Sequence, residues 1–295
     1  MGYAFALVAV VCGSIKGFCG KKISTYTEKM MGAAYLNFIR MLICTLISLI
    51  IALLTDGEAV FSASFGLIGV AAFSGIMTSV MAISWLFAVR GSAYMLVEVF
   101  LTIGGIVPLA LSYVFFDEPI FFSGIVGFLI LMLAIFVLCS YSSSVKGKIK
   151  FSDIVILCIV SLSNGLMGFS QKIFNHSIEK EAAATFNFYS FVFSAIVFGM
   201  FFAIKRESGV PKVITMPAKA YGFVLIMAVC LFGNSFFNTL AAAKLLAYQL
   251  YPLSQGCGLI ISTIMAALFF GEKVKLRLVI GVLLTFVGVL IMNVI

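Results

Sequence analysis

Charged residues are scarce in this chain: they make up 10% of its 295 residues, whereas a soluble domain carries about 25%. Hydrophobic residues make up 63% of the sequence, which is more than a soluble core could bury. The charges lie in short islands between long apolar runs, and no island is long enough to form a soluble domain. Lipid is the solvent that fits this composition, and we expect a multi-pass protein of the bacterial cell (inner) membrane.

Residues that would indicate an enzyme or a pump are also few. The chain has one histidine, His176, and Glu98 is the one acidic residue inside an apolar run, whereas an enzyme would need a cluster of such groups for metal or acid–base chemistry. The seven cysteines show no metal-binding spacing, and no Walker phosphate loop is present to drive a primary pump. We therefore expect no catalytic residue, no bound metal and no cofactor.

Apolar runs of about 20 residues predict an all-α membrane protein, because the runs are continuous and do not alternate as barrel strands would. Ten spans are predicted, at residues 3–20, 33–54, 65–88, 93–115, 119–139, 154–174, 183–204, 220–242, 245–269 and 276–294.

An internal repeat organises these spans. Residues 93–118 and 247–272 align without a gap, with eight of 26 positions identical. Shorter matches at a similar offset extend the repeat, so we predict two five-helix repeats, residues 1–139 and 154–295, joined by a linker at 140–153. Because five is odd, the second repeat enters the membrane from the opposite side, and such inverted pairs suit alternating access.

Basic residues give the chain a net charge of +8, which we attribute to juxtamembrane side chains rather than to a nucleic-acid surface. With Lys16 and Arg40 left out, fourteen basic residues fall on one side of the predicted membrane, and Lys172, Lys180 and Lys244 fall on the other. The positive-inside rule then places the fourteen in the cytoplasm and both termini outside.

The end of each repeat carries the most specific pattern, which is a long span, an acidic turn and a glycine-spaced helix. The residues are Phe115-Phe116-Asp117-Glu118 with Gly127, and Phe269-Phe270-Gly271-Glu272 with Gly281 and Gly288. Over nearly its whole length the chain resembles the drug/metabolite transporter superfamily, in its EamA-like type. The resemblance implies ten helices in two repeats and transport of a small molecule. Family members are often described with both termini in the cytoplasm, opposite to the orientation that the basic residues predict.

Glu98 and Lys16 are the first candidate site residues, because a charge inside a span is costly and usually faces a cavity or a partner. Glu98 would bind a cationic group or a coupling proton, or would form a structural ion pair with Lys16 or Arg40. Lys16 lies among glycines that allow close helix approach. It would bind a substrate carboxylate, neutralise Glu98 or reach toward the interface. For Arg40 we favour structural anchoring.

Aromatic and polar side chains extend the predicted site. Trp85 and Tyr94, with the Glu98 carboxylate, could hold an amine, although such aromatics also anchor helices at membrane interfaces. The ninth predicted span has a polar start with Tyr248, Tyr251 and Gln255, of which the last two share a helix face.

Further polar residues complete the predicted site. Pro252 removes a backbone donor from the ninth span, and interrupted helices are where transporters often bind substrate. Asn164, Asn234 and Asn238 would complete the lining, or would instead make hydrogen bonds between helices.

These features favour a secondary active or facilitative transporter that works by alternating access. Its substrate would be a small polar metabolite that bears an amine, such as an amino acid or an organic cation. A translocator of lipid or lipid-linked substrates is the alternative, and an integral-membrane enzyme fits less well. The expected partners are the small-molecule substrate, the lipid bilayer and, for a coupled mechanism, a proton. A complete inverted pair in one chain needs no second subunit, so we expect a monomer.

Overall fold

The computed structural model describes residues 1–26, 30–91, 94–118, 122–146, 151–178, 182–206, 218–270 and 276–293, and all regular structure within these ranges is helical. The α-helices are α1 (Gly2–Ile23), α2 (Met30–Asp56), α3 (Phe65–Gly91), α4 (Tyr94–Gly104), α5 (Ile106–Phe116), α6 (Phe122–Lys146), α7 (Phe151–Ser177), α8 (Ala183–Arg206), α9 (Ala218–Ala242), α10 (Ala247–Phe269) and α11 (Leu276–Asn293). Short 3-10 helices, η1 (Ser24–Tyr26) and η2 (Gly57–Ser62), follow α1 and α2. The predicted all-α fold is confirmed.

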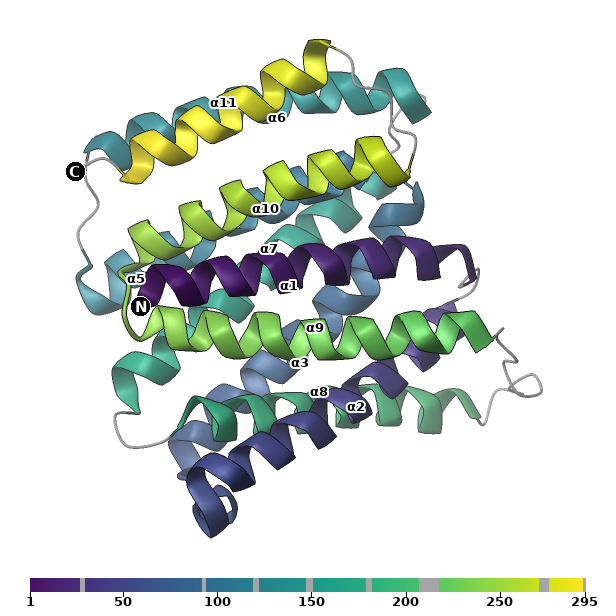
Figure 1. The fold of residues 1–295 in the computed structure, drawn as a ribbon, viewed down its shortest axis with the longest axis vertical. Coiled ribbons are helices and arrows are strands. Elements are labelled where there is room, and N and C mark those ends of the chain that lie inside the picture. The colour runs from purple at the N-terminus through teal and green to yellow at the C-terminus, as the bar shows by residue number, and fades with distance from the viewer. Residues whose placement is uncertain are drawn as a thin grey trace.

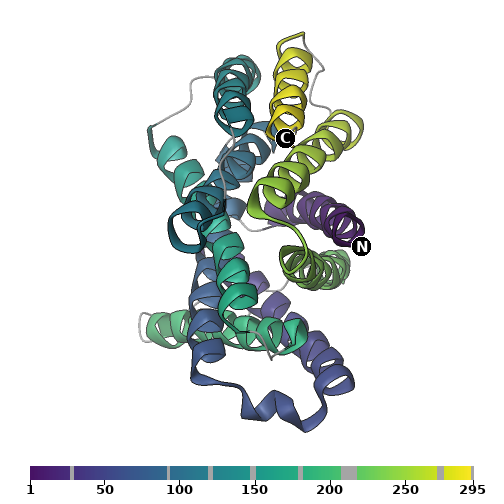
Figure 2. The ribbon, with the colours of Figure 1, turned by 90° about the vertical axis from the view of Figure 1, so that its left-hand side faces the viewer.

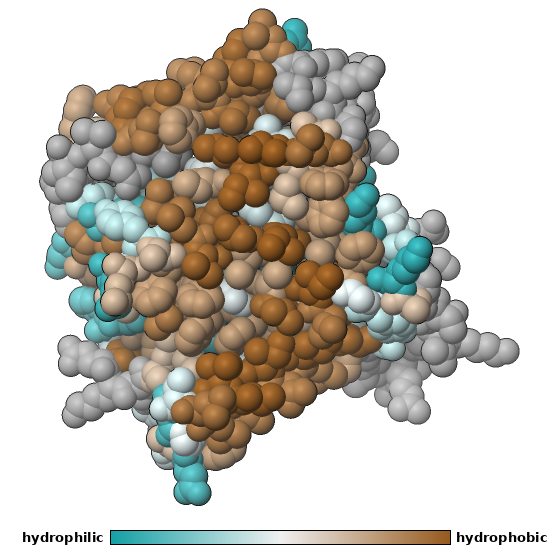
Figure 3. Space-filling model, viewed as in Figure 1, coloured by the Kyte–Doolittle hydropathy of each residue, from teal (hydrophilic) through white to brown (hydrophobic). Residues whose placement is uncertain are grey.

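The surface has the character of a membrane protein. Within the described ranges, eight helical stretches are long and apolar enough to cross a bilayer, and shorter apolar stretches occur at Phe122–Ala134 in α6 and Leu276–Gly288 in α11. Figure 3 shows apolar side chains over the middle of one face and hydrophilic ones gathered at two opposite edges. Large side chains such as Phe65, which is 95% exposed, are stable there only against lipid. The chain is an integral, multi-pass membrane protein.

The fourth predicted span, residues 93–115, is not one continuous helix. It is divided into α4, which ends at Gly104, and α5, which begins at Ile106. With α4 and α5 counted as one broken span, the helices correspond to the ten predicted spans. Pro252 lies inside α10, which continues as a helix on both sides of this proline, so the interruption of a span is found between α4 and α5.

The predicted linker at 140–153 is also shorter than expected. Helix α6 continues to Lys146, and α7 begins at Phe151. Residues 147–150 lie outside the described residues. The division of the chain into two repeats at this point stays a prediction of the sequence.

Helices from the two halves interleave in two layers. Helix α1 packs against α9 and α10, whereas α7 packs against α3, α4 and α5, and Figure 2 shows the two groups on opposite sides of the molecule. Exchanging the two halves converts one set of contacts into the other, because α1 corresponds to α7 and α9–α10 correspond to α3–α5. The pairs α2 with α8 and α6 with α11 map onto themselves.

The two halves run in opposite directions. A Cβ atom added at Gly2, where α1 begins, would lie 2.9 Å from Leu245 Cγ, and the Leu245 carbonyl accepts a hydrogen bond from Lys172 near the end of α7. At the other edge, a Cβ added at Gly91 would lie 3.2 Å from Asp153 Oδ1 at the start of α7. Helix α7 thus ends where its counterpart α1 begins, as inverted repeats require.

Both ends of the chain lie on the same edge of the molecule, as Figure 1 shows. An even number of membrane crossings requires this placement. Lys21, Lys22 and Arg90 lie in the last turns of α1 and α3, at the opposite edge. The assignment of that edge to the cytoplasm stays a prediction from the positive-inside rule.

Candidate functional site

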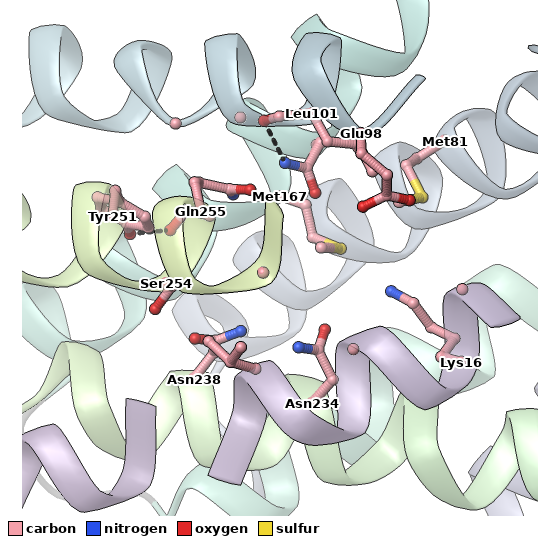
Figure 4. Close-up of a pocket in the computed structure, with 18 of the residues that line it drawn as sticks. Lys16, Met81, Glu98, Leu101, Met167, Asn234, Asn238, Tyr251, Ser254 and Gln255 are labelled. Atoms are coloured by element: carbon pink, nitrogen blue, oxygen red, sulfur yellow. Dashed lines mark hydrogen bonds between the residues drawn. The ribbon is translucent and has the colours of Figure 1, made fainter. Parts of the chain in front are cut away.

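A polar cavity lies between the two layers (Figure 4). Its volume is about 110 Å³, which leaves room for several water molecules because each needs about 10–15 Å³. Helices α1, α9 and α10 contribute Val10, Gly13, Ser14, Lys16, Gly17, Asn234, Asn238, Tyr251, Ser254, Gln255, Gly258 and Ser262. From α3, α4, α5, α7 and the break at Gly105 come Met81, Trp85, Glu98, Leu101, Gly105, Pro108, Asn164, Gly165, Met167, Gly168 and Gln171.

Eight of the ten predicted site residues line this cavity. They are Lys16, Trp85, Glu98, Asn164, Asn234, Asn238, Tyr251 and Gln255. Tyr94 does not line it, because its ring is fully buried and packs edge-on against Trp85, with ring centroids 6.4 Å apart. Tyr248 is also buried away from the cavity lining.

The break between α4 and α5 shapes one wall. The Gly105 amide donates to the Thr102 carbonyl at 3.1 Å, instead of to the Leu101 carbonyl as a regular α-helix requires. The Leu101 carbonyl then accepts from Asn164 Nδ2 on α7 at 3.4 Å. Asn164 therefore satisfies the Leu101 carbonyl, which the break leaves without its helical partner. In membrane proteins, side chains of neighbouring helices commonly satisfy backbone groups freed where a helix is interrupted.

Glu98 lies on α4 and lines the cavity. One carboxylate oxygen accepts a hydrogen bond from Ser262 Oγ at 3.1 Å, and the Tyr94 hydroxyl interacts with the same carboxylate. A Cβ added at Gly17 on α1 would lie 3.7 Å from Glu98 Oε1, so the glycine leaves room for the acid. The structural ion pair with Lys16 or Arg40, which was the alternative for Glu98, is not formed within 4.0 Å among the described residues.

Two cations, the partly buried Lys16 and the buried Arg40, lie beside the cavity. Figure 4 shows the Lys16 side chain across the cavity from the Glu98 carboxylate. Arg40 on α2 is 5% exposed, and its buried Nε has no hydrogen-bond partner in the described part of the chain. Both cations line a second, smaller cavity of about 20 Å³, which shares Trp85 and Met81 with the first.

Helix α10 presents one polar face to the cavity. Tyr251, Gln255, Gly258 and Ser262 recur at helical spacing and all line it. The Tyr251 hydroxyl donates to the Gly168 carbonyl of α7 at 2.7 Å, so this tyrosine also joins the two layers. The sequence reasoning found the first two of these residues, and the same periodicity could have found the serine.

The asparagines of α9 differ in what they contact. Asn234 Nδ2 donates to the Ala9 carbonyl at 2.8 Å, which is an interhelical hydrogen bond of the kind that the sequence left open. Asn238, one turn further on, makes no hydrogen bond within the described ranges and faces the cavity. The sequence reasoning missed Met81 and Met167 of the lining, because methionine in an apolar span gives no signal.

A polar contact joins the halves beyond one end of the cavity. Lys172 Nζ lies 2.8 Å from Glu118 Oε1 and donates to the Leu245 carbonyl at 2.8 Å, while Glu118 Oε2 accepts from the Ala247 amide at 2.7 Å. Beyond the other end, Lys21 Nζ donates to the Val89 carbonyl. Lys21 and Lys172 occupy equivalent positions in the repeat, so the two ends are built alike.

Phenylalanine contacts follow the same symmetry. On α1, Phe18 packs against Phe269 and Phe270, with ring centroids 5.1 Å and 5.6 Å apart. On α7, Phe169 packs against Phe115 and Phe116 at 5.8 Å and 5.7 Å. Each contact joins the first helix of one half to the end of the fourth span of the other half.

Comparisons with known proteins agree with this architecture. Residues 151–294 match the model of the EamA-like transporter family. A solved structure described only as a crystal structure of a protein has a TM-score of 0.70 and 12% sequence identity, and the match covers 99% of this chain and 96% of that one. At this identity the likeness concerns the fold alone. No curated protein matches the chain in sequence. Residues 151–294 thus form an EamA-like unit, and this match supports membership of the chain in the drug/metabolite transporter superfamily.

Proposed function

We propose that the protein is a secondary transporter of a small, polar, amine-bearing metabolite. The observation that supports this most directly is the position of Glu98. The carboxylate lies in a polar cavity between two inverted halves, at the depth of the membrane-spanning helices. An acid there is costly unless it serves a ligand, a proton or a partner charge, and no cation lies within 4.0 Å of it in the described part of the chain.

The architecture supports alternating access as the mechanism. Because the halves are inverted, each contact at one end of the cavity has a counterpart at the other end, as the pairs of Phe18 and Phe169 illustrate. Rocking one layer against the other would loosen one set of contacts and tighten the equivalent set. The broken fourth span carries Glu98 on α4. Local movement at the break between α4 and α5 would admit the substrate.

Glu98 could serve a substrate ammonium, a coupling proton or both in turn. Trp85 adds an aromatic face to the same cavity, and such faces attract ammonium groups. The transporter would act as a monomer, because one chain holds both halves of the cavity, and it would reside in the bacterial inner membrane.

Uptake into proteoliposomes tests the proposal. Purified full-length protein is reconstituted, and labelled amino acids and organic cations are offered singly, with labelled phospholipid offered in parallel. We expect saturable uptake of at least one amine and no flip of phospholipid. Phospholipid flip without any uptake of water-soluble amines would contradict the proposal and favour the lipid translocator.

A further inference from the structure

The second, smaller cavity carries an excess of positive charge. It is lined by Lys16 and Arg40 together with Gly17, Thr78, Met81, Ala82, Trp85, Met167, Met227 and Leu231. Among the residues that the structure describes, no carboxylate lines it. The two cations lie close enough to influence one another electrostatically, so each makes the other more costly to bury.

Arg40 is the clearest sign that an acceptor belongs here. A guanidinium has five N–H donors and needs acceptors for them when it is buried. Arg40 is 5% exposed, yet its Nε has no partner, and the one ion pair within the described ranges is that of Lys172 with Glu118. A buried charge without a partner is rare in native proteins. The side chain is therefore equipped for an anion that the protein does not itself provide.

The smaller cavity adjoins the larger one. Lys16, Gly17, Met81, Trp85 and Met167 line both, so Lys16 stands at the junction. Glu98 lines only the larger cavity, on the far side of that junction, and is more than 4.0 Å from the Lys16 amine. A single small molecule that carries both charges can thus contact the acid on one side and the two cations on the other.

From this arrangement, and given the transport function proposed above, we infer that Lys16 and Arg40 form a subsite for the carboxylate of an α-amino acid whose ammonium group lies at Glu98. The planar fork of Arg40 suits two-point binding of a carboxylate, and Lys16 adds a point charge. The inference narrows the substrate from amines in general to zwitterions. It assigns Arg40 a binding role instead of structural anchoring.

Ligands that differ in one charge test this subsite. Trp85 is the single tryptophan of the chain and lines both cavities, so its fluorescence in the purified full-length protein reports binding, with thermal stability as a second readout. The twenty proteinogenic L-amino acids are screened first. Leucine and glutamine are then compared with the amines that lack their carboxylate and the acids that lack their amine, such as isopentylamine and 4-methylpentanoate for leucine.

For wild-type protein we expect an amino acid to bind roughly 10- to 100-fold more tightly than its amine, which is the effect of a charge-assisted, bidentate contact. In Arg40→Gln this preference should vanish while the amine binds as before. Arg40→Lys should retain part of it, and the exposed Arg277→Gln is the matched control. Chloride at high concentration should compete with the amino acid and not with the amine.

The outcomes separate this inference from the proposed function. If amines and amino acids bind with equal affinity to the wild-type protein, or if Arg40→Gln keeps the preference, the carboxylate subsite is wrong although amine transport stands. If neither class binds and neither is taken up, both are wrong. Because the wild-type comparison needs no variant, a misfolded Arg40→Gln protein does not block the test.

Discussion

The ammonium of Lys172 lies 2.8 Å from the carboxylate of Glu118 and joins the second half of the chain to the first. Both side chains are nearly buried, at 6% and 15% exposure, and Glu118 also accepts the backbone amide of Ala247 at the start of α10. Three elements, α5, α7 and α10, thus meet at one pair of side chains. Glu118 lies in the acidic turn that follows the end of α5, and it receives its hydrogen bonds from Lys172 of α7 and Ala247 of α10.

Glu118→Gln should loosen this end of the cavity. The variant can still accept from Ala247, but it leaves the Lys172 charge buried without a carboxylate, and breaking such a pair costs about 3–5 kcal/mol. In a chain whose native cysteines are replaced and which carries Gln171→Cys in the cavity wall, a membrane-impermeant maleimide should label faster after Glu118→Gln. The exposed Glu58→Gln serves as control, and equal labelling rates in the two variants would refute a sealing role.

Close approach of α3 and α8 should depend on one glycine. A Cβ at Gly75 would contact the Ser190 carbonyl and lie 2.8 Å from Phe193 Cβ; one turn further on, the Ser79 and Ser194 hydroxyls share a hydrogen bond of 2.7 Å. Gly75→Ala should destabilise the protein by about 1–3 kcal/mol, seen as a lower unfolding temperature in detergent.

Gly69 on the same helix is the matched control. A Cβ there would meet nothing within 4 Å, so Gly69→Ala should leave stability unchanged or raise it by up to about 1 kcal/mol through helix propensity. If Gly69→Ala and Gly75→Ala changed the unfolding temperature to a similar extent, the added methyl group at Gly75 would meet no closer neighbour than the one at Gly69. The α3–α8 contact would then be looser than described.

Two cavity asparagines should separate stability from binding. Asn164→Ala removes the partner of the Leu101 carbonyl beside the helix break and should lower stability by about 1–3 kcal/mol, the cost of an unsatisfied buried group. Asn238→Ala removes an amide that makes no hydrogen bond in the described part of the chain, so it should weaken substrate affinity with little change in unfolding temperature. If Asn238→Ala lowered the unfolding temperature and Asn164→Ala weakened binding instead, the roles assigned to the two asparagines would be wrong.

Much of the fold could be predicted from the sequence, because lipid demands continuous apolar helices and leaves few alternatives. Within the described ranges a helix or a broken helix is found at each predicted span, eight stretches are long and apolar enough to cross a membrane, and the apolar stretches of α6 and α11 are shorter. The break at Gly104 and Gly105 was missed. Paired glycines within an apolar run can mark a helix break or a close helix contact, and the sequence alone does not distinguish these two roles. The structure does, through the contact of α4 with Gly165 of α7.

The lining of the cavity could be predicted in part. Polar residues in apolar spans, such as Glu98 and Asn238, are costly enough to mark the cavity from sequence alone. Tyr94 shows the limit of this reasoning, since a tyrosine can lie one turn from the acid and still face the core. Arg40 shows another, because whether this buried arginine has a partner depends on the four other helices that line its cavity, α1, α3, α7 and α9.

The most direct test of the account is transport by the Glu98→Gln variant. Glutamine keeps the size of the side chain and can still accept from Ser262, so the fold should survive, as an unchanged unfolding temperature would verify. In proteoliposomes, uptake of the best substrate should fall at least tenfold, by loss of about 1.4 kcal/mol or more of binding energy, while Glu58→Gln transports like wild type. Normal uptake by a folded Glu98→Gln protein would contradict the central claim that this carboxylate receives the substrate.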